Sequence, residues 1–146
     1  MGQLSDSIKA SLALAYASGT ADRTGEIIDM SGYEGVMIVV HVHAVATGAT
    51  VAVKAQTATA VGFGSPHDVL GSSQAVADDD DGQVFIIDIK APSERFVRVY
   101  LDNDAANAVA ASAMYYRYGV GYAPQTNAAT DLVSIETFYQ TSTGTA

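Results

Sequence analysis

The chain has 146 residues, of which 49% are hydrophobic and 16% are charged, and it contains no cysteine. This length predicts a single domain with enough surface to bury a core, and the absence of cysteine excludes disulfides and thiolate metal sites. The formal net charge of −9 disfavours contacts with nucleic acid or anionic membranes, because an acidic surface repels phosphate groups.

Residues 1–18 are expected to form an extended arm that ends in a strand near residues 12–16, although Ser5 and Ser7 could each begin a short helix. Their apolar stretch is too short for a signal peptide or a membrane span, so we expect a soluble protein without an export signal. Turn residues at 18–20 and 31–35 then flank a short strand over residues 24–29.

Residues 36–45 give the strongest strand signal in the chain. The even positions are wholly apolar, and the odd positions are Met37, Val39, His41 and His43. Apolar residues on both faces predict a central strand. Residues 50–57 alternate between small apolar and polar side chains, and we expect them to pair with residues 36–45 as a hairpin.

Residues 58–82 are rich in glycine, serine, proline and aspartate and sustain no helical period, which predicts a long excursion. Its acidic run at residues 78–81 could hold Ca²⁺ through carboxylate oxygens. The run lacks the spaced aspartates and the distant glutamate of a calcium-binding hand. The sequence therefore favours a solvated acidic turn that precedes a buried strand.

The stretch from residue 83 to residue 101 predicts a second hairpin, with its connection at residues 91–93, where proline suits a turn. Its first strand, residues 84–89, is an almost unbroken apolar run. In its second strand, residues 97, 99 and 101 are expected to point inward, and residues 96, 98 and 100 outward. Residues 108–118 predict a further long strand that ends in a cluster of tyrosines.

These elements predict an all-β fold: an antiparallel β-sandwich or jelly roll with extended N- and C-terminal arms. We expect one domain over residues 1–146, with its core at about residues 12–118. Residues 119–146 are polar except for an apolar patch at residues 132–139. They predict a C-terminal arm rather than core.

Two kinds of chemistry find little support in the sequence. His41 and His43 share a strand face and could ligate a metal together, but His67 is the only other histidine, and zinc usually needs three or four protein ligands. The chain also lacks a G-x-S-x-G elbow and a glycine-rich phosphate loop. We therefore expect no catalytic residue, no metal and no cofactor.

Tyrosine and arginine are enriched at protein interfaces, and they gather at two strand ends of this chain. They could instead line a sugar-binding face or be ordinary sheet residues. With the apolar patch of the C-terminal arm, the predicted partner-binding residues are Arg98, Tyr100, Tyr115, Tyr116, Arg117, Tyr118, Leu132, Ile135, Phe138 and Tyr139.

In chain order, the sequence carries the blocks TGEIIDMSGYEGVMIVVHVHAV, ATVAVKAQ and DDDDGQVFIIDIKAPSERFVRVYLD, then the tyrosine-ending strand and a polar tail. The third block contains a P-x-E-R-[FY]-V-R pattern, formed by Pro92, Glu94, Arg95, Phe96, Val97 and Arg98. In these features, which span about residues 12–118, the chain resembles the head-decoration, or capsid cement, proteins of tailed bacteriophages.

The resemblance implies a β-sandwich or jelly roll without enzymatic activity. It implies a homodimer or homotrimer that binds the outside of the shell formed by the major capsid protein. The protein would then be a virion component on the capsid exterior, assembled in the host cytoplasm. One alternative is a carbohydrate- or receptor-binding module on a virion or tail, although the chain has no tryptophan. Another is a small all-β enzyme that uses the acidic run or the histidines.

Overall fold

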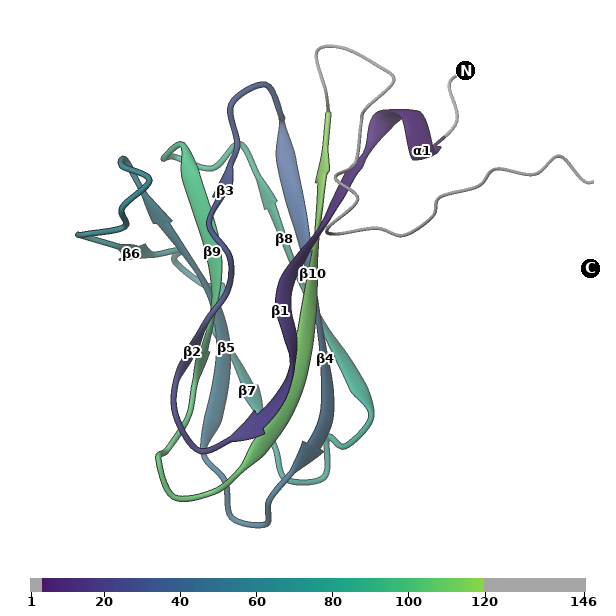
Figure 1. Cartoon of the computed structure of the whole chain (residues 1–146), viewed down its shortest axis with the longest axis vertical. Coiled ribbons are helices and arrows are strands. Elements are labelled where there is room, and N and C mark those ends of the chain that lie inside the picture. Colours follow the sequence, from purple (N-terminus) through teal and green to yellow (C-terminus); the bar gives the residue numbers. More distant parts are fainter. Residues whose placement is uncertain (1–3, 120–146) are drawn as a thin grey trace, which may run out of the picture.

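The computed structural model describes residues 4–119, which form two antiparallel β-sheets packed face to face (Figure 1). The elements are α1 (Leu4–Ser7), β1 (Lys9–Gly19), β2 (Arg23–Thr24), β3 (Ile28–Asp29), β4 (Gly35–Val45), β5 (Val51–Ala58), β6 (His67–Asp68), β7 (Gln74–Val76), β8 (Gln83–Lys90), β9 (Phe96–Asp102) and β10 (Val109–Tyr118). Within this part of the chain, no helix is long and apolar enough to cross a membrane.

The strand order identifies the sandwich as a jelly roll. The first sheet has the order β1-β10-β4-β8, and the second sheet has the order β2-β9-β5-β6. Strand β3 also pairs with β9, and β7 also pairs with β5, so β2 with β3 and β6 with β7 each act as one interrupted strand. The ten strands then reduce to eight, in the orders 1-8-3-6 and 2-7-4-5, which is the jelly-roll arrangement. The predicted all-β sandwich is confirmed. Residues 4–19, predicted as an extended arm that ends in a strand, form α1 and the edge strand β1, and the predicted C-terminal arm beyond Gly119 lies outside the described residues.

Both predicted hairpins are wrong. Strands β4 and β5 lie in different sheets, and so do β8 and β9. The connection from β8 to β9 crosses between the sheets at Ala91, which has a positive φ of 48° and donates its backbone N–H to the carbonyl of Glu34 at 2.7 Å. A turn signal between two strands does not reveal whether the second strand returns to the same sheet.

Strand β4 is central, as its two apolar faces predicted, because it lies between β10 and β8. Its even-numbered side chains from Val36 to Val42 are fully buried between the sheets. The prediction of a buried strand after the acidic run is wrong, since β8 is an edge strand. Ile87 and Ile89 face the core, whereas Val84 and Ile86 are 53% and 52% exposed.

Tyr115 connects the two sheets where the strand formed by β2 and β3 is interrupted. Its ring is fully buried. Its hydroxyl accepts the backbone N–H of Val99 in β9 and donates to the carbonyl of Glu26, each at 2.8 Å. Burial raises the pKa of this hydroxyl well above its usual range. Gly25 leaves the space for this contact, because a Cβ there would lie 2.7 Å from the Tyr115 oxygen.

Aspartates fix the loops at the lower end of Figure 1. The Asp104 carboxylate accepts backbone N–H groups from Thr50 at 2.8 Å, Ala106 at 2.9 Å and Asn107 at 2.8 Å. It thereby joins the β9–β10 turn to the start of β5. These hydrogen bonds, with that of Thr50 the strongest, hold the pKa of Asp104 far below its usual range.

We expect the protein to lose stability as the pH falls from about 4 towards 2, where an unfolded aspartate takes up its proton. The folded-state pKa of Asp104 is depressed, and the bond to Arg95 lowers the pKa of Asp29 to about 2. Both carboxylates therefore stabilise the fold fully above the unfolded pKa of aspartate, and this stabilisation is lost as the pH falls towards their lower folded-state pKa values. The test is to measure melting temperatures of the parent chain and of Asp104→Ala from pH 7 to pH 2. At neutral pH the variant should melt at a lower temperature than the parent chain, and its melting temperature should fall less as the pH is lowered.

The exposed Asp79 provides the matched control, because Asp79→Ala should keep the acid dependence of the parent chain. Equal acid sensitivity in the parent and in Asp104→Ala would contradict the assignment.

Candidate interaction surface

One row of apolar side chains crosses the outer face of the first sheet from edge to edge. The strand register pairs Leu12 of β1 with Met114 of β10, Met114 with Val39 of β4, and Val39 with Ile86 of β8. Residues paired across strands point to the same side of a sheet. Leu12 is 36% exposed, and Val39 and Met114 are half-buried. These four residues form a continuous stripe, which we call the apolar row.

A second row lies beside the apolar row, towards the end of β10. Tyr116 pairs with Met37, which pairs with Asp88. Asp88 is bonded within the chain, because the Tyr118 hydroxyl donates to its carboxylate at 2.6 Å. Burial, the larger cause, and this bond raise the pKa of Tyr118 to about 12. The charge of Asp88 therefore sits at the margin of an otherwise apolar and aromatic surface.

A third row lies on the opposite side of the apolar row and carries both histidines of β4. Ser112 pairs with His41, which pairs with the exposed Val84. The rings of His41 and His43 lie 3.9 Å apart between centroids, and the ring of Tyr16 meets that of His43 edge-on at 4.9 Å. The Nε2 atom of His43 lies 2.9 Å from the hydroxyl of Ser112. The histidines thus extend the packed surface of this face.

We call these three rows together the outer face. Its members are Leu12, Met114, Val39 and Ile86 of the apolar row, with Met37, Tyr116, Asp88, His41, His43, Ser112, Val84 and Tyr16 around them.

The outer side of the second sheet has the opposite character, because its polar groups bond to one another. Lys54 forms an ion pair with Asp68 at 2.8 Å, which is the main reason that the pKa of Asp68 is lowered. The Tyr100 hydroxyl donates to Asp22 at 2.7 Å, and this bond raises the tyrosine pKa to about 12. Arg98 donates to Gln56 at 2.9 Å. The polar groups of this side are therefore paired with one another, unlike the apolar groups on the outer side of the first sheet.

The structure separates the partner-binding residues that the sequence predicted. Tyr116 and Tyr118 lie on the outer side of the first sheet, whereas Arg98 and Tyr100 lie on that of the second sheet. Tyr115 and Arg117 are instead core residues, with 0% and 9% exposure. The reason is strand alternation: consecutive residues of β10 cannot share one face. The remaining four, Leu132, Ile135, Phe138 and Tyr139, lie outside the described residues.

Arg117 illustrates why an arginine can be buried at this position. Its Nη1 donates to the backbone carbonyl of Asp29 at 2.9 Å, and its guanidinium lies 4.9 Å from the centre of the Tyr33 ring. The apolar row was not predicted as a site. Its signal was present in Met37 and Val39, at odd positions of residues 36–45, and in the almost unbroken apolar run at residues 84–89. Both stretches leave hydrophobic side chains on the outer side as well.

The two candidate cation sites, which are the acidic run at residues 78–81 and the pair of His41 and His43, form hydrogen bonds within the protein. Between residues 4 and 119, no cluster of three or more His, Cys, Asp or Glu side chains is placed to hold a metal ion. The Asp81 carboxylate accepts the N–H of Val45 at 2.7 Å, and that of Asp78 accepts the N–H of Gly48 at 3.1 Å. Part of the acidic run therefore ties its own loop to the turn that follows β4.

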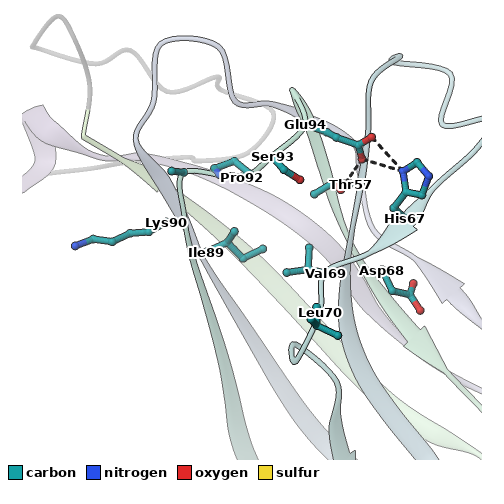
Figure 2. Close-up of a pocket in the computed structure, with 11 residues that line it drawn as sticks. Thr57, His67, Asp68, Val69, Leu70, Ile89, Lys90, Pro92, Ser93 and Glu94 are labelled. Carbon is teal, nitrogen blue, oxygen red and sulfur yellow. Dashed lines mark hydrogen bonds and ion pairs between the residues drawn. The ribbon is translucent and has the colours of Figure 1, made fainter.

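A hollow of about 610 Å³ lies beside the β8–β9 connection, and Figure 2 shows the residues that line it. Glu94 projects into it and accepts the Thr57 hydroxyl at 2.6 Å, while His67 Nδ1 lies 3.1 Å from the same carboxylate. These bonds, led by that of Thr57, lower the pKa of Glu94. None of the eleven residues around the hollow is tyrosine, phenylalanine or tryptophan, the large rings on which sugars usually stack. Glu94, Thr57 and His67 thus bond to one another, and Asp68 bonds to Lys54 and Gln56 outside the hollow.

Comparison with known proteins supports the fold. No protein-family model and no curated protein matches the chain. Among solved structures, the chain is similar to a protein of Bacillus endospore appendages, which form a family of disulfide-linked pili. The TM-score is 0.50 at 16% sequence identity, and the alignment covers 82% of this chain and 93% of that chain. At this identity the likeness concerns the β-sandwich fold alone.

Proposed function

We propose that this chain is a structural virion protein that binds the outside of a bacteriophage capsid and stabilises contacts between major capsid protein subunits. The observation that carries the proposal is the apolar row, which leaves hydrophobic side chains exposed from one edge of the first sheet to the other. Contiguous apolar surface of this kind marks an interaction site. A broad sheet face suits the surface of another protein better than it suits a small ligand.

The sequence resemblance to head-decoration proteins supplies the class of partner. Self-association as a dimer or trimer belongs to the same proposal, because many modest contacts repeated on a symmetric lattice give strong overall binding. The similar appendage protein belongs to disulfide-linked pili. This chain has no cysteine, so disulfides cannot link it into an assembly, and the proposal assigns that role to contacts of the outer face.

The test is co-sedimentation with shells that consist of the major capsid protein of the phage that encodes this chain, without the decoration protein. Replacing Ile86 by aspartate puts a carboxylate into the apolar row at a half-exposed position. We expect shell binding to weaken about tenfold or more, because burying an unpaired charge at an interface is costly. Circular dichroism and the melting temperature should stay close to those of the parent chain.

The matched control is Thr24→Asp, which places the same carboxylate at an exposed strand position of the second sheet. It should bind shells as the parent chain does. If both variants lose shell binding equally, the added negative charge rather than its position would explain the loss. If both variants bind shells as the parent chain does, the outer face would not be part of the contact. Failure of the parent chain to bind such shells would refute the proposed function itself.

A further inference from the structure

The outer face presents apolar side chains on a chain whose net charge is −9. Exposed hydrophobic surface on a free protein is commonly covered by another segment or promotes association. We propose that residues 132–139 of the same chain cover the outer face while the protein is free of its partner. The proposal concerns the surface used in the proposed function, but it requires no shell.

The composition of the C-terminal segment supports this assignment. Residues 120–146 lie outside the described part of the chain, and their sequence is dominated by threonine, alanine and other small or polar residues. The stretch LVSIETFY at residues 132–139 is the exception. Its β-branched and aromatic side chains are the types that pack well on a sheet. The segment thus offers apolar groups that match the character of the apolar row.

The chain leaves the described structure at the end of the outer face itself. Gly119 follows β10, an inner strand of the first sheet, and has a left-handed φ of 67°. A Cβ at this position would collide with the side chain of Glu34, whose N–H bonds to the carbonyls of Tyr118 at 3.0 Å and Gly119 at 3.2 Å. These contacts fix the position of Gly119, the last described residue, at the end of β10.

The linking residues are long enough to reach the apolar row. Residues 120–131 can span up to about 40 Å when extended. Met114, in the middle of the row, lies about 14 Å along β10 from Tyr118, because a strand advances about 3.4 Å per residue. The segment can therefore return over the face from which it departs.

A segment of the same chain has two advantages over a second copy of the protein. Its link keeps it at an effective concentration on the order of millimolar near the face. A second copy would bring another net charge of −9, and like charges oppose close approach. The residues that the sequence predicted as partner contacts would then bind first to the chain's own sheet, and a shell would have to displace them.

The absence of cysteine allows a direct test by site-specific crosslinking of the full chain. The variant carries Ile86→Cys in the apolar row together with Ile135→Cys in the C-terminal segment. At low micromolar protein, a short bismaleimide should join the two thiols within one chain, identified by intact mass and by peptide mass spectrometry. The matched control pairs Ile135→Cys with Thr24→Cys on the second sheet, and it should crosslink at least fivefold more slowly.

Adding Phe138→Asp to the Ile86→Cys and Ile135→Cys variant should reduce its crosslinking to the rate of the control. Equal rates in the two cysteine pairs would overturn the proposal. Crosslinked dimers whose yield grows with protein concentration would assign the outer face to a second copy and would overturn it as well. No shell is present in this experiment, so its result is independent of whether the protein binds capsids.

Discussion

Replacing Tyr115 by phenylalanine is expected to lower the free energy of unfolding by about 2–4 kcal/mol, because a buried backbone N–H and a partly buried backbone carbonyl lose their partner. The hydroxyl supplies the acceptor for Val99 N–H and the donor for the Glu26 carbonyl. Both groups lie where the strand formed by β2 and β3 is interrupted, so no neighbouring strand replaces the lost bonds. Chemical denaturation followed by circular dichroism measures the change.

Tyr116 is the matched control, because it is the next residue of β10 and lies on the outer side of the sheet. Tyr116→Phe should change the stability by about 0.5 kcal/mol or less, as most substitutions away from buried groups do. If the two variants were equally stable, Tyr115 would not connect the two sheets as described.

Replacing Ile38 by alanine is expected to cost about 2–5 kcal/mol, because the fully buried side chain leaves a cavity between two packed sheets. Ile38 lies in the central strand β4, between Tyr115 of β10 and Ile87 of β8. Paired residues on both flanking strands border the site, and they cannot collapse into it without moving the sheet. The same denaturation experiment gives the value.

Ile27→Ala removes the same atoms from a partly exposed position between β2 and β3. We expect this control to cost about 1 kcal/mol or less. A similar loss in both variants would mean that Ile38 does not lie in the main core.

The all-β class and the inner faces of the sheets could be predicted from alternation. Val97, Val99 and Leu101 point inward and are buried, as their spacing indicated. The central position of β4 followed from its apolar residues on both sides. These features depend on neighbours along one strand, which a sequence displays directly.

The sheet to which each strand belongs could not be predicted in this way. The signal at residues 91–93 is the same for a hairpin and for a crossing between sheets. The outcome depends on distant contacts, such as the bond from Ala91 to Glu34. The burial of Tyr115 and Arg117 also depends on distant contacts, because their partners, Glu26 and Asp29, lie far away in the sequence.

The candidate site was only partly visible for a related reason. The enrichment of tyrosine and arginine predicts an interface, yet the structure distributes these residues over two faces and the core. The surface that stands out consists of aliphatic residues that resembled ordinary core positions in the sequence. Val39 and Ile86 become neighbours only through the register of β4 with β8.

The pairing of β1 with β10 also constrains how the protein comes to be folded. Lys9 pairs with Arg117, so the first sheet cannot close until almost all described residues have been synthesised. Pairings between such distant residues slow folding, because a long loop must be ordered before the contact forms. During translation β4 is therefore synthesised well before β10 and cannot yet pair with it on that side. Completion of the sandwich is expected to follow release of the strand that carries Tyr115 from the ribosome.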